Sequence, residues 1–289
     1  MKAFSNNRRR ILSLWLPRLP IDRIKRGLKC PNVALDDPSN AAPNVVVAKE
    51  NNALKIYSLD ETAAHSGLSI GLPLANARAI CPHLKVFDAD ESSDARTLGE
   101  IADWCDRFTP LVALDPPHGL FLDVTGCAHL FGGEAAMLRL LCDVLTAQGF
   151  AVSAAIASTA VCARTMTRHV HGRIVPDGEE ADAVGPLPVS SLGADIAITN
   201  GLRRAGLKTI GDVAFRARHE ITARFGAAFT TRLEQALGQG DAPISPRKPL
   251  PDYIVEKRAP NRAVISPGAR AATSPMVLRP ARRRPVVIA

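Results

Sequence analysis

The chain has 289 residues, of which 46% are hydrophobic and 22% are charged, and its formal net charge is +8 at pH 7. This composition is that of a folded protein with enough apolar residues to bury a substantial core in two or three structural units. No uninterrupted apolar stretch of about 18 residues is present, and the apolar run after Arg8-Arg9-Arg10 is too short for a signal peptide. We therefore expect a cytoplasmic protein.

The positive charge is concentrated at the C-terminal end of the chain. Residues 259–289 contain six arginines and no acidic residue, which leaves only +2 for the first 258 residues. Net charge alone is therefore weak support for nucleic-acid binding. The six cysteines are far apart and include no Cys-x-x-Cys pair, so we predict neither a disulfide nor a zinc site.

Hydrophobic periodicity predicts alternating strands and helices along the first 170 residues. An apolar run at residues 11–16 predicts a buried strand, and a short helix is expected at residues 20–26. Further strands are expected at residues 45–48, 55–58, 84–87, 111–114, 120–123 and 152–156, with a turn at Asn51-Asn52. Further helices are expected at residues 61–65, 74–80, 93–108, 134–147 and 159–168. This order fits an α+β fold with a split βαβ, ferredoxin-like sheet.

Residues 198–214 carry the clearest binding motif. A helix at residues 198–205 is followed by Gly206-Leu207-Lys208-Thr209 and by the start of a second helix, the pattern of a helix-hairpin-helix. Glycine lets the backbone approach a ligand closely, and N–H groups at the start of the second helix can hold a DNA phosphate. The candidate DNA-binding residues, in contacts independent of base sequence, are Arg203, Arg204, Gly206, Lys208, Thr209 and Gly211. The alternative is a helix-to-helix connection that only packs this helical region.

The run Leu122-Asp123-Val124-Thr125 resembles the second sequence block of the Y-family translesion DNA polymerases of the UmuC and DinB type. In that family a metal-binding Asp-Glu pair precedes Leu-Asp-(Val/Ile)-Thr, and here the pair falls on His118 and Gly119. The family's first block reads apolar-x-x-Asp-x-Asp, and here Trp15 and Pro17 stand at its acidic positions. Nucleotidyl transfer needs two divalent cations held by clustered carboxylates, which these four side chains do not supply.

The nucleotide-contacting segment of the family shows the same substitution pattern. Its Gly-Val-x-x-Gly-Met-Pro run is kept at residues 67–73, but Glu61 and Ala64 stand where the family has the Tyr and Arg that contact the triphosphate. An Ala cannot supply the forked donors with which Arg binds phosphate. Together with the opening run from Leu14 to Asp22, these blocks resemble the ImuB-like, catalytically degenerate branch of the Y-family, over about residues 8 to 258.

The resemblance implies a division into polymerase-like domains. The expected ranges are a palm-like domain at residues 1–40 and 84–170, a small fingers-like insertion at 41–83, and a helical thumb with the helix-hairpin-helix at 171–242. Residues 243–289 are expected to form a Pro- and Arg-rich linker and a disordered tail, so that the family's little-finger domain is missing.

The function implied by the resemblance is that of a non-catalytic DNA-binding scaffold in DNA damage tolerance, in translesion synthesis and SOS-type induced mutagenesis, with no cofactor. The implied partners are primer-template DNA, an ImuA-like RecA homologue, an error-prone replicative-type polymerase and the sliding clamp, although the usual C-terminal docking region is expected to be absent. Two alternatives remain open. One is an active Y-family polymerase that holds Mg²⁺ with Asp115, Asp123 or Glu61, and the other is an inert truncated fragment.

Overall fold

The computed structural model describes residues 9–28, 42–240 and 243–247, and its centre is a five-stranded sheet of order β5-β6-β1-β7-β8. The strands are β1 (Ile11–Trp15), β5 (Val112–Asp115), β6 (Gly119–Asp123), β7 (Ser153–Ala157) and β8 (Arg173–Ile174). Strand β1 runs antiparallel to both β6 and β7, whereas β7 and β8 run parallel. This is the split βαβ sheet predicted from the sequence, with β8 added at one edge.

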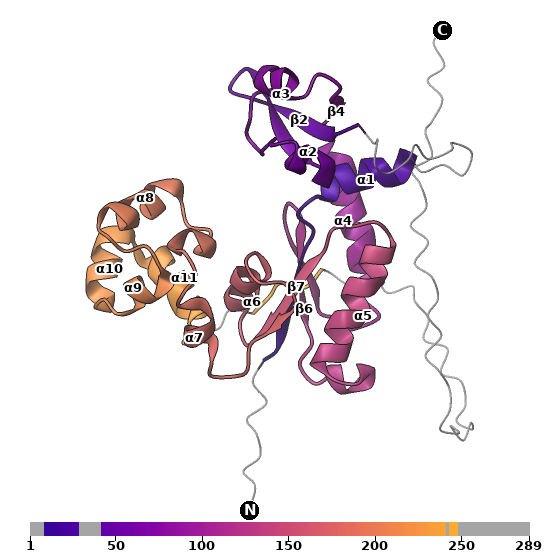
Figure 1. Cartoon of the computed structure of the whole chain (residues 1–289). Helices are drawn as coiled ribbons and strands as arrows, with labels where there is room; N and C mark the ends of the chain where they lie inside the picture. The colour runs from indigo at the N-terminus through magenta and orange to yellow at the C-terminus, as the bar shows by residue number, and fades with distance from the viewer. Residues whose placement is uncertain (1–8, 29–41, 241–242, 248–289) are drawn as a thin grey trace, which may run out of the picture.

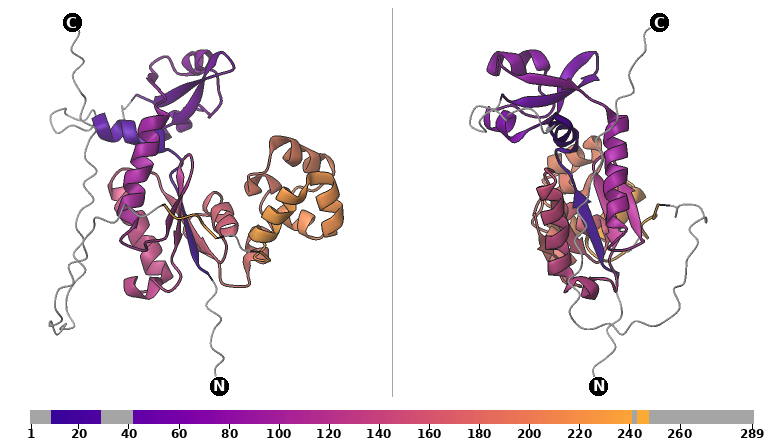
Figure 2. Two further views of the ribbon diagram at one scale, coloured as in Figure 1. Left: turned by 180° about the vertical axis from the view of Figure 1, so that it is seen from behind. Right: turned by 90° about the vertical axis from the view of Figure 1, so that its right-hand side faces the viewer.

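Helices cover both faces of this sheet (Figure 1, Figure 2). Helices α4 (Glu91–Cys105) and α5 (Glu134–Ala147) pack on one face in a core with Leu12 and Leu14, and a short turn of 3-10 helix, η2 (Ala128–Phe131), precedes α5. Helix α6 (Ala160–Thr167) packs on the other face in a core with Ile11. Both faces are buried because successive side chains of a strand point to opposite sides. We call the sheet and these three helices the palm.

A small three-stranded sheet of order β3-β2-β4 lies beyond helix α1 (Figure 1). Its elements, which we call the fingers, are β2 (Asn44–Glu50), β3 (Ala53–Leu59), α2 (Glu61–His65), α3 (Leu74–Ile80) and β4 (Lys85–Asp88), and α1 (Leu19–Leu28) connects them to the palm. Asn51 and Asn52 have φ angles of 48° and 64° and form the predicted turn between β2 and β3.

Strand β4 corrects the predicted boundary between palm and fingers. The sequence reading placed residues 84–87 in the palm, but β4 pairs in parallel with β2 and so completes the small sheet. A parallel partner needs a crossover connection, and α2 and α3 supply it by returning the chain to the start of β2. The fingers therefore extend to residue 88.

A bundle of short helices follows β8, and we call it the thumb. Its elements are α7 (Glu180–Val184), η3 (Val189–Leu192), α8 (Ile196–Arg204), α9 (Ile210–Ala214), α10 (Arg218–Phe225) and α11 (Ala227–Ala236). Helix α11 packs on α6, where the Thr159 hydroxyl donates a 2.6 Å hydrogen bond to the carbonyl oxygen of Gln235. Within the described ranges, no helix is long and apolar enough to cross a membrane.

Residues 243–247 run from the thumb back to the palm. The backbone N–H of Arg247 donates to the carbonyl oxygen of Val112 in β5 at 2.9 Å. The Arg247 guanidinium lies 2.6 Å from Asp103 and 3.0 Å from Asp106, at the end of α4. The first residues of the predicted linker are thus bound to the palm, and the rest of the linker and the predicted Arg-rich tail lie outside the described residues.

Helix α5 provides a test of the core. Leu141 is fully buried, whereas its neighbour Leu140 is 36% exposed. We predict that Leu141→Ala lowers the free energy of unfolding by about 2–5 kcal/mol, because lost burial adds to the cost of a cavity, and that Leu140→Ala costs less than about 1 kcal/mol. Urea denaturation of both variants measures the difference. Equal losses would contradict the assigned inner face of α5.

Candidate functional site at the strand ends and the thumb hairpin

The four positions at which the polymerase pattern has acidic residues lie together at one end of the central sheet. Trp15 pairs with Gly119 in the register of β1 and β6. The backbone N–H of Leu16 donates to the carbonyl oxygen of His118 at 2.9 Å, and Pro17 is the next residue in the chain. The structure therefore brings together residues of two sequence blocks that are about a hundred positions apart.

Gly119 occupies a position in which a side chain does not fit. A Cβ atom at this residue would lie 2.9 Å from the carbonyl oxygen of Asp115 and 3.0 Å from its carboxylate Oδ2. Asp115 is the partner of Gly119 across the β5–β6 hairpin. Even an alanine at position 119 would force the hairpin backbone to move, so this position cannot present a glutamate in the observed fold.

Trp15 and His118 contact side chains from other elements. The guanidinium of Arg168, at the end of α6, lies 5.3 Å from the centre of the Trp15 ring. Nε2 of His118 lies 3.4 Å from the hydroxyl oxygen of Tyr57 in β3, and the two rings meet edge to face. Burial lowers the pKa of His118, and the opposing effect of Asp94 does not cancel this, so His118 is neutral at neutral pH.

Asp115 adjoins this cluster and is paired with two arginines. Its Oδ2 lies 3.0 Å from Nε of Arg164 and 3.8 Å from a terminal nitrogen of Arg168. Only 15% of the Asp115 side chain is exposed, so these pairs are partly shielded from water. A divalent cation at Asp115 would have to displace a guanidinium and would be repelled by the other. The end of the sheet is therefore an arginine site and not a cluster of carboxylates.

Asp115 and Asp123 do not come together. Asp115 pairs with Gly119 at the hairpin turn, whereas Asp123 pairs with Ile11 at the other end of β6. At about 3.3 Å per residue this places them about 13 Å apart, whereas paired catalytic cations lie about 4 Å apart. Asp123 lies 3.4 Å from Arg9 instead. The register contradicts a metal site shared by the two residues, and the described part of the chain contains no group of three His, Cys, Asp or Glu placed to hold a metal.

The glycine-containing segment at residues 67–73 keeps an ordered backbone. Gly71 has a φ of +85° and donates its N–H to the carbonyl oxygen of Ile56 at 2.8 Å, which holds the segment against β3. Ala64 lies in α2, and Glu61, the first residue of α2, is 3.6 Å from Arg18 at the palm. The segment is therefore held against β3, and Glu61 and Ala64 of the nearby α2 stand in place of the Tyr and Arg of the family pattern.

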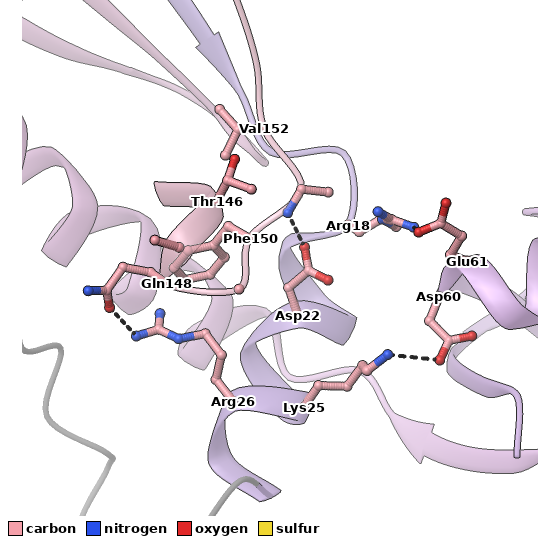
Figure 3. Close-up of a pocket in the computed structure, with 13 residues that line it drawn as sticks. Arg18, Asp22, Lys25, Arg26, Asp60, Glu61, Thr146, Gln148, Phe150 and Val152 are labelled. Carbon is pink, nitrogen blue, oxygen red and sulfur yellow. Dashed lines mark hydrogen bonds and ion pairs between the residues drawn. The ribbon is translucent and has the colours of Figure 1, made fainter. Parts of the chain in front are cut away.

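A cavity of about 590 Å³ lies between α1, the start of α2 and residues 146–152, which comprise the end of α5 and the segment after it (Figure 3). Its charged lining residues are Arg18, Asp22, Lys25, Arg26, Asp60 and Glu61. Nζ of Lys25 lies 3.2 Å from Asp60, and Asp22 accepts the N–H of Ala151 at 2.8 Å. The three acids and three bases balance, so the cavity selects neither anions nor cations. Its ion pairs join the fingers to the palm.

The predicted helix-hairpin-helix is formed by α8, residues 205–208 and α9. Gly206 has a φ of +79°, which favours glycine. The seven backbone N–H groups of residues 206–212 all donate hydrogen bonds within the protein. Oδ2 of Asp212 accepts two of them, from Lys208 at 3.0 Å and Thr209 at 2.8 Å. The expected phosphate contact through free N–H groups is therefore wrong, because the Asp212 carboxylate occupies the place of the anion.

The other candidate residues of the hairpin divide into two groups. Gly211 is a packing residue, because its N–H donates to the carbonyl oxygen of Gly185 at 2.9 Å and a Cβ would lie 3.2 Å from the same oxygen. Arg203, Arg204 and Lys208 are exposed, and no ion pair to them occurs among the described residues. Their side chains are therefore available to phosphate, and their DNA-binding role stays a prediction.

Sequence reasoning missed Phe215 and Arg216, which follow α9. Phe215 is 93% exposed, and together with Arg216 and the hairpin it lines a hollow of about 280 Å³. A signal was present in the sequence. Ile210 and Val213 form the buried face of α9, and Phe215 falls outside their helical spacing.

Comparison with known proteins identifies relatives that match between 65% and 73% of the chain. Residues 32–168 match the impB/mucB/samB family. Protein ImuB of Caulobacter vibrioides (strain NA1000 / CB15N) is 42% identical over 189 residues, which are 65% of this chain and 41% of that protein. DNA polymerase IV of Desulfatibacillum aliphaticivorans is 29% identical over 220 residues, which are 73% of this chain and 55% of that protein. The matched part thus spans about two fifths of the ImuB protein.

Solved structures of Y-family polymerases have the same fold. DinB from Sulfolobus solfataricus has a TM-score of 0.65 at 15% identity and covers 82% of this chain and 69% of that one. The insertion ternary complex of Dbh DNA polymerase has a TM-score of 0.67 at 15% identity and covers 81% and 69%. The predicted α+β fold with a Y-family polymerase-like palm is confirmed.

His118 is expected to make stability depend on pH. Its pKa is lower in the folded protein than the ordinary value, so the unfolded state binds more protons in that range. We predict that stability is lost as the pH falls from about 7.5 to about 5.5, and that His118→Gln removes part of this dependence. Urea denaturation at a series of pH values measures it, with the exposed His65→Gln as control. The same pH slope in both variants would contradict the assignment.

Thr209 is expected to stabilise the hairpin through its side chain. Its hydroxyl accepts the N–H of Asp212 at 3.1 Å and forms half of a reciprocal capping box. We predict that Thr209→Ala lowers the free energy of unfolding by about 1 kcal/mol, measured by urea denaturation. Thr231→Ala, at an exposed position inside α11, is the matched control and should cost little. A Thr209→Ala variant as stable as this control would show that the cap does not form.

Proposed function

Because residues 32–168 form an impB/mucB/samB family domain on a Y-family polymerase fold, we propose that this protein binds DNA in damage tolerance without catalysing nucleotide addition. It acts as a scaffold that holds primer-template DNA for a separate error-prone polymerase. The observation that carries the proposal is Gly119, where the fold leaves no room for the side chain that a metal ligand requires.

The charges around Gly119 support a non-catalytic role. Two-metal nucleotidyl transfer concentrates negative side chains at the strand ends, so that they neutralise two divalent cations. Here Asp115 is paired with Arg164 and Arg168, and Trp15 lies beneath the second of these arginines. A site with two fixed guanidinium groups favours anions, and it disfavours the cations that the reaction needs.

The thumb supports the DNA-binding half of the proposal. Residues 196–225 contain six Lys and Arg residues against two acidic residues. Lys208 is exposed on the hairpin, with Arg203 and Arg204 at the end of the preceding helix. Because the backbone N–H groups of the hairpin are occupied, the phosphate contacts come from these side chains. Such contacts release counterions, so affinity falls steeply with salt and does not depend on base sequence.

We also propose three kinds of protein partner. They are an ImuA-like RecA homologue, an error-prone replicative-type polymerase and the sliding clamp, which the family resemblance implies. The aligned part of this chain covers 41% of the Caulobacter ImuB protein. Contacts that the rest of that protein makes are therefore not proposed for this chain.

We predict that Lys208→Glu weakens binding to a fluorescent primer-template and reduces the slope of log affinity against log salt by about 1. Titrations at a series of salt concentrations measure both quantities. Lys85→Glu makes the same charge change at an exposed position in β4 and should leave both nearly unchanged. Equal effects of the two variants would indicate a nonspecific response to net charge and would contradict the hairpin site.

Two further outcomes would overturn the proposal itself. Mg²⁺-dependent primer extension by the purified protein would show that it is an enzyme with unorthodox ligands. Failure of the wild-type protein to bind primer-template DNA even at low salt would favour the inert alternative.

A further inference from the structure

We propose that Phe215 stacks on an unpaired base of a DNA strand whose phosphates contact Lys208 and Arg216. This inference rests on the proposed function, and it adds the class of DNA that the thumb selects. Gapped or single-stranded regions are bound in preference to an intact duplex.

The exposure of Phe215 sets it apart from the other phenylalanines of the thumb. Its side chain is 93% exposed. Phe225 and Phe229 pack against each other with ring centres 6.1 Å apart, and Phe229 is buried in the core. Helix α9 already fills that core with Ile210 and Val213, so Phe215 is not needed to hold the helix in place. An aromatic ring left in water beside a charged hairpin is a candidate for ligand contact.

The ring adjoins a hollow of about 280 Å³ that the hairpin helps to form. Gly206, Leu207, Asp212, Phe215 and Arg216 line it. A Cβ atom at Gly206 would meet nothing within 4 Å, so the hairpin side of the hollow is open to a flat group. Hydrogen bonds from Thr209 and Lys208 lower the pKa of Asp212, with a smaller contribution from nearby Arg216. Asp212 thus stays ionised as an internal cap while Arg216 lies close to it.

The charges favour nucleic acid over a protein segment as the occupant. Arg216 lines the hollow, Lys208 follows the lining residue Leu207, and both are exposed within a stretch that carries six basic residues against two acidic ones. Nucleic acid is a polyanion, and each of its nucleotides also has a flat aromatic base. It therefore matches a site that combines cationic side chains with a phenyl ring. Every base has such a face, so the contact adds affinity without sequence preference.

The same geometry explains a preference for unpaired bases. In an intact duplex each base face is covered by its neighbours, and a side chain that inserts there must first unstack them. A base in a gap or a single strand has a free face. Phe215 therefore discriminates between DNA structures, whereas Lys208 and Arg216 bind the phosphates of both.

The experiment uses the full-length chain and two DNA probes of equal length, a complete duplex and a gapped duplex with 2-aminopurine at an unpaired position. We expect the wild-type protein to bind the gapped probe more tightly and to quench its fluorescence. Phe215→Ala should weaken binding to the gapped probe about tenfold, with little effect on the duplex and an unchanged salt dependence. Phe215→Trp should preserve the preference. Ile196→Ala, which removes a 78% exposed apolar side chain from the same domain, is the matched control and should have no effect.

The outcomes separate this inference from the proposed function. If the wild-type protein binds both probes and Phe215→Ala keeps the preference and the quenching, the inference is wrong and the DNA-binding role stands. Equal losses on the two probes would also overturn it, because Phe215 would then contact the duplex. If the wild-type protein binds neither probe, the proposed function fails. Circular dichroism of each variant verifies folding, which an exposed position such as 215 should leave unchanged.

Discussion

The pairing of β1 on both of its edges is the constraint on which the rest of the structure depends. All five residues of β1 pair with β6 on one side and with β7 on the other. This register directs Leu12 and Leu14 into the core beneath α4 and α5, and Ile11 into the core beneath α6. A slip of one residue would exchange the two faces. The same register fixes Trp15 opposite Gly119, so the chemistry of the strand ends is set by the packing of the strands.

Side chains at the strand ends, in the fingers and in α1 contact one another within the protein. Tyr57 contacts His118 and Glu61 contacts Arg18 across the boundary between fingers and palm, and Lys25 of the connecting helix α1 contacts Asp60. These contacts hold the two parts together without a ligand.

The sequence predicted the order and type of most elements because their signals are local. Apolar runs, helical spacing and the Asn51-Asn52 turn each act within a few residues. Helix α4 starts at Glu91, two residues earlier than predicted, because the Asp90 side chain accepts the N–H of Ser93 and caps it. Small errors of this kind at helix ends arise because a capping side chain sets the end of the helix, and the spacing of apolar residues contains no information about the cap.

The errors at the site have longer-range causes. β4 pairs with a strand just over forty residues earlier, and no local sequence pattern identifies that partner. Two helices joined by a short turn stand where the hairpin motif was predicted, but the Asp212 carboxylate turns back and accepts two of the hairpin N–H groups. The crowding at Gly119 depends on Asp115 across the turn. These features depend on contacts between residues in the folded chain. A sequence motif gives the residue types and their spacing, but it does not give those contacts.

The attachment of Arg247 to the palm has a consequence for how the thumb can move. The thumb is joined to the palm at its start, after β8, and the chain returns at residues 243–247 to the opposite edge strand β5. A domain that is attached at both ends and also packs on α6 has less freedom to move than a domain held by one linker. The hairpin and Phe215 are therefore carried on a domain whose chain is attached at both edges of the palm sheet, and at the second edge two carboxylates, one on α4 and one at its C-cap, hold Arg247.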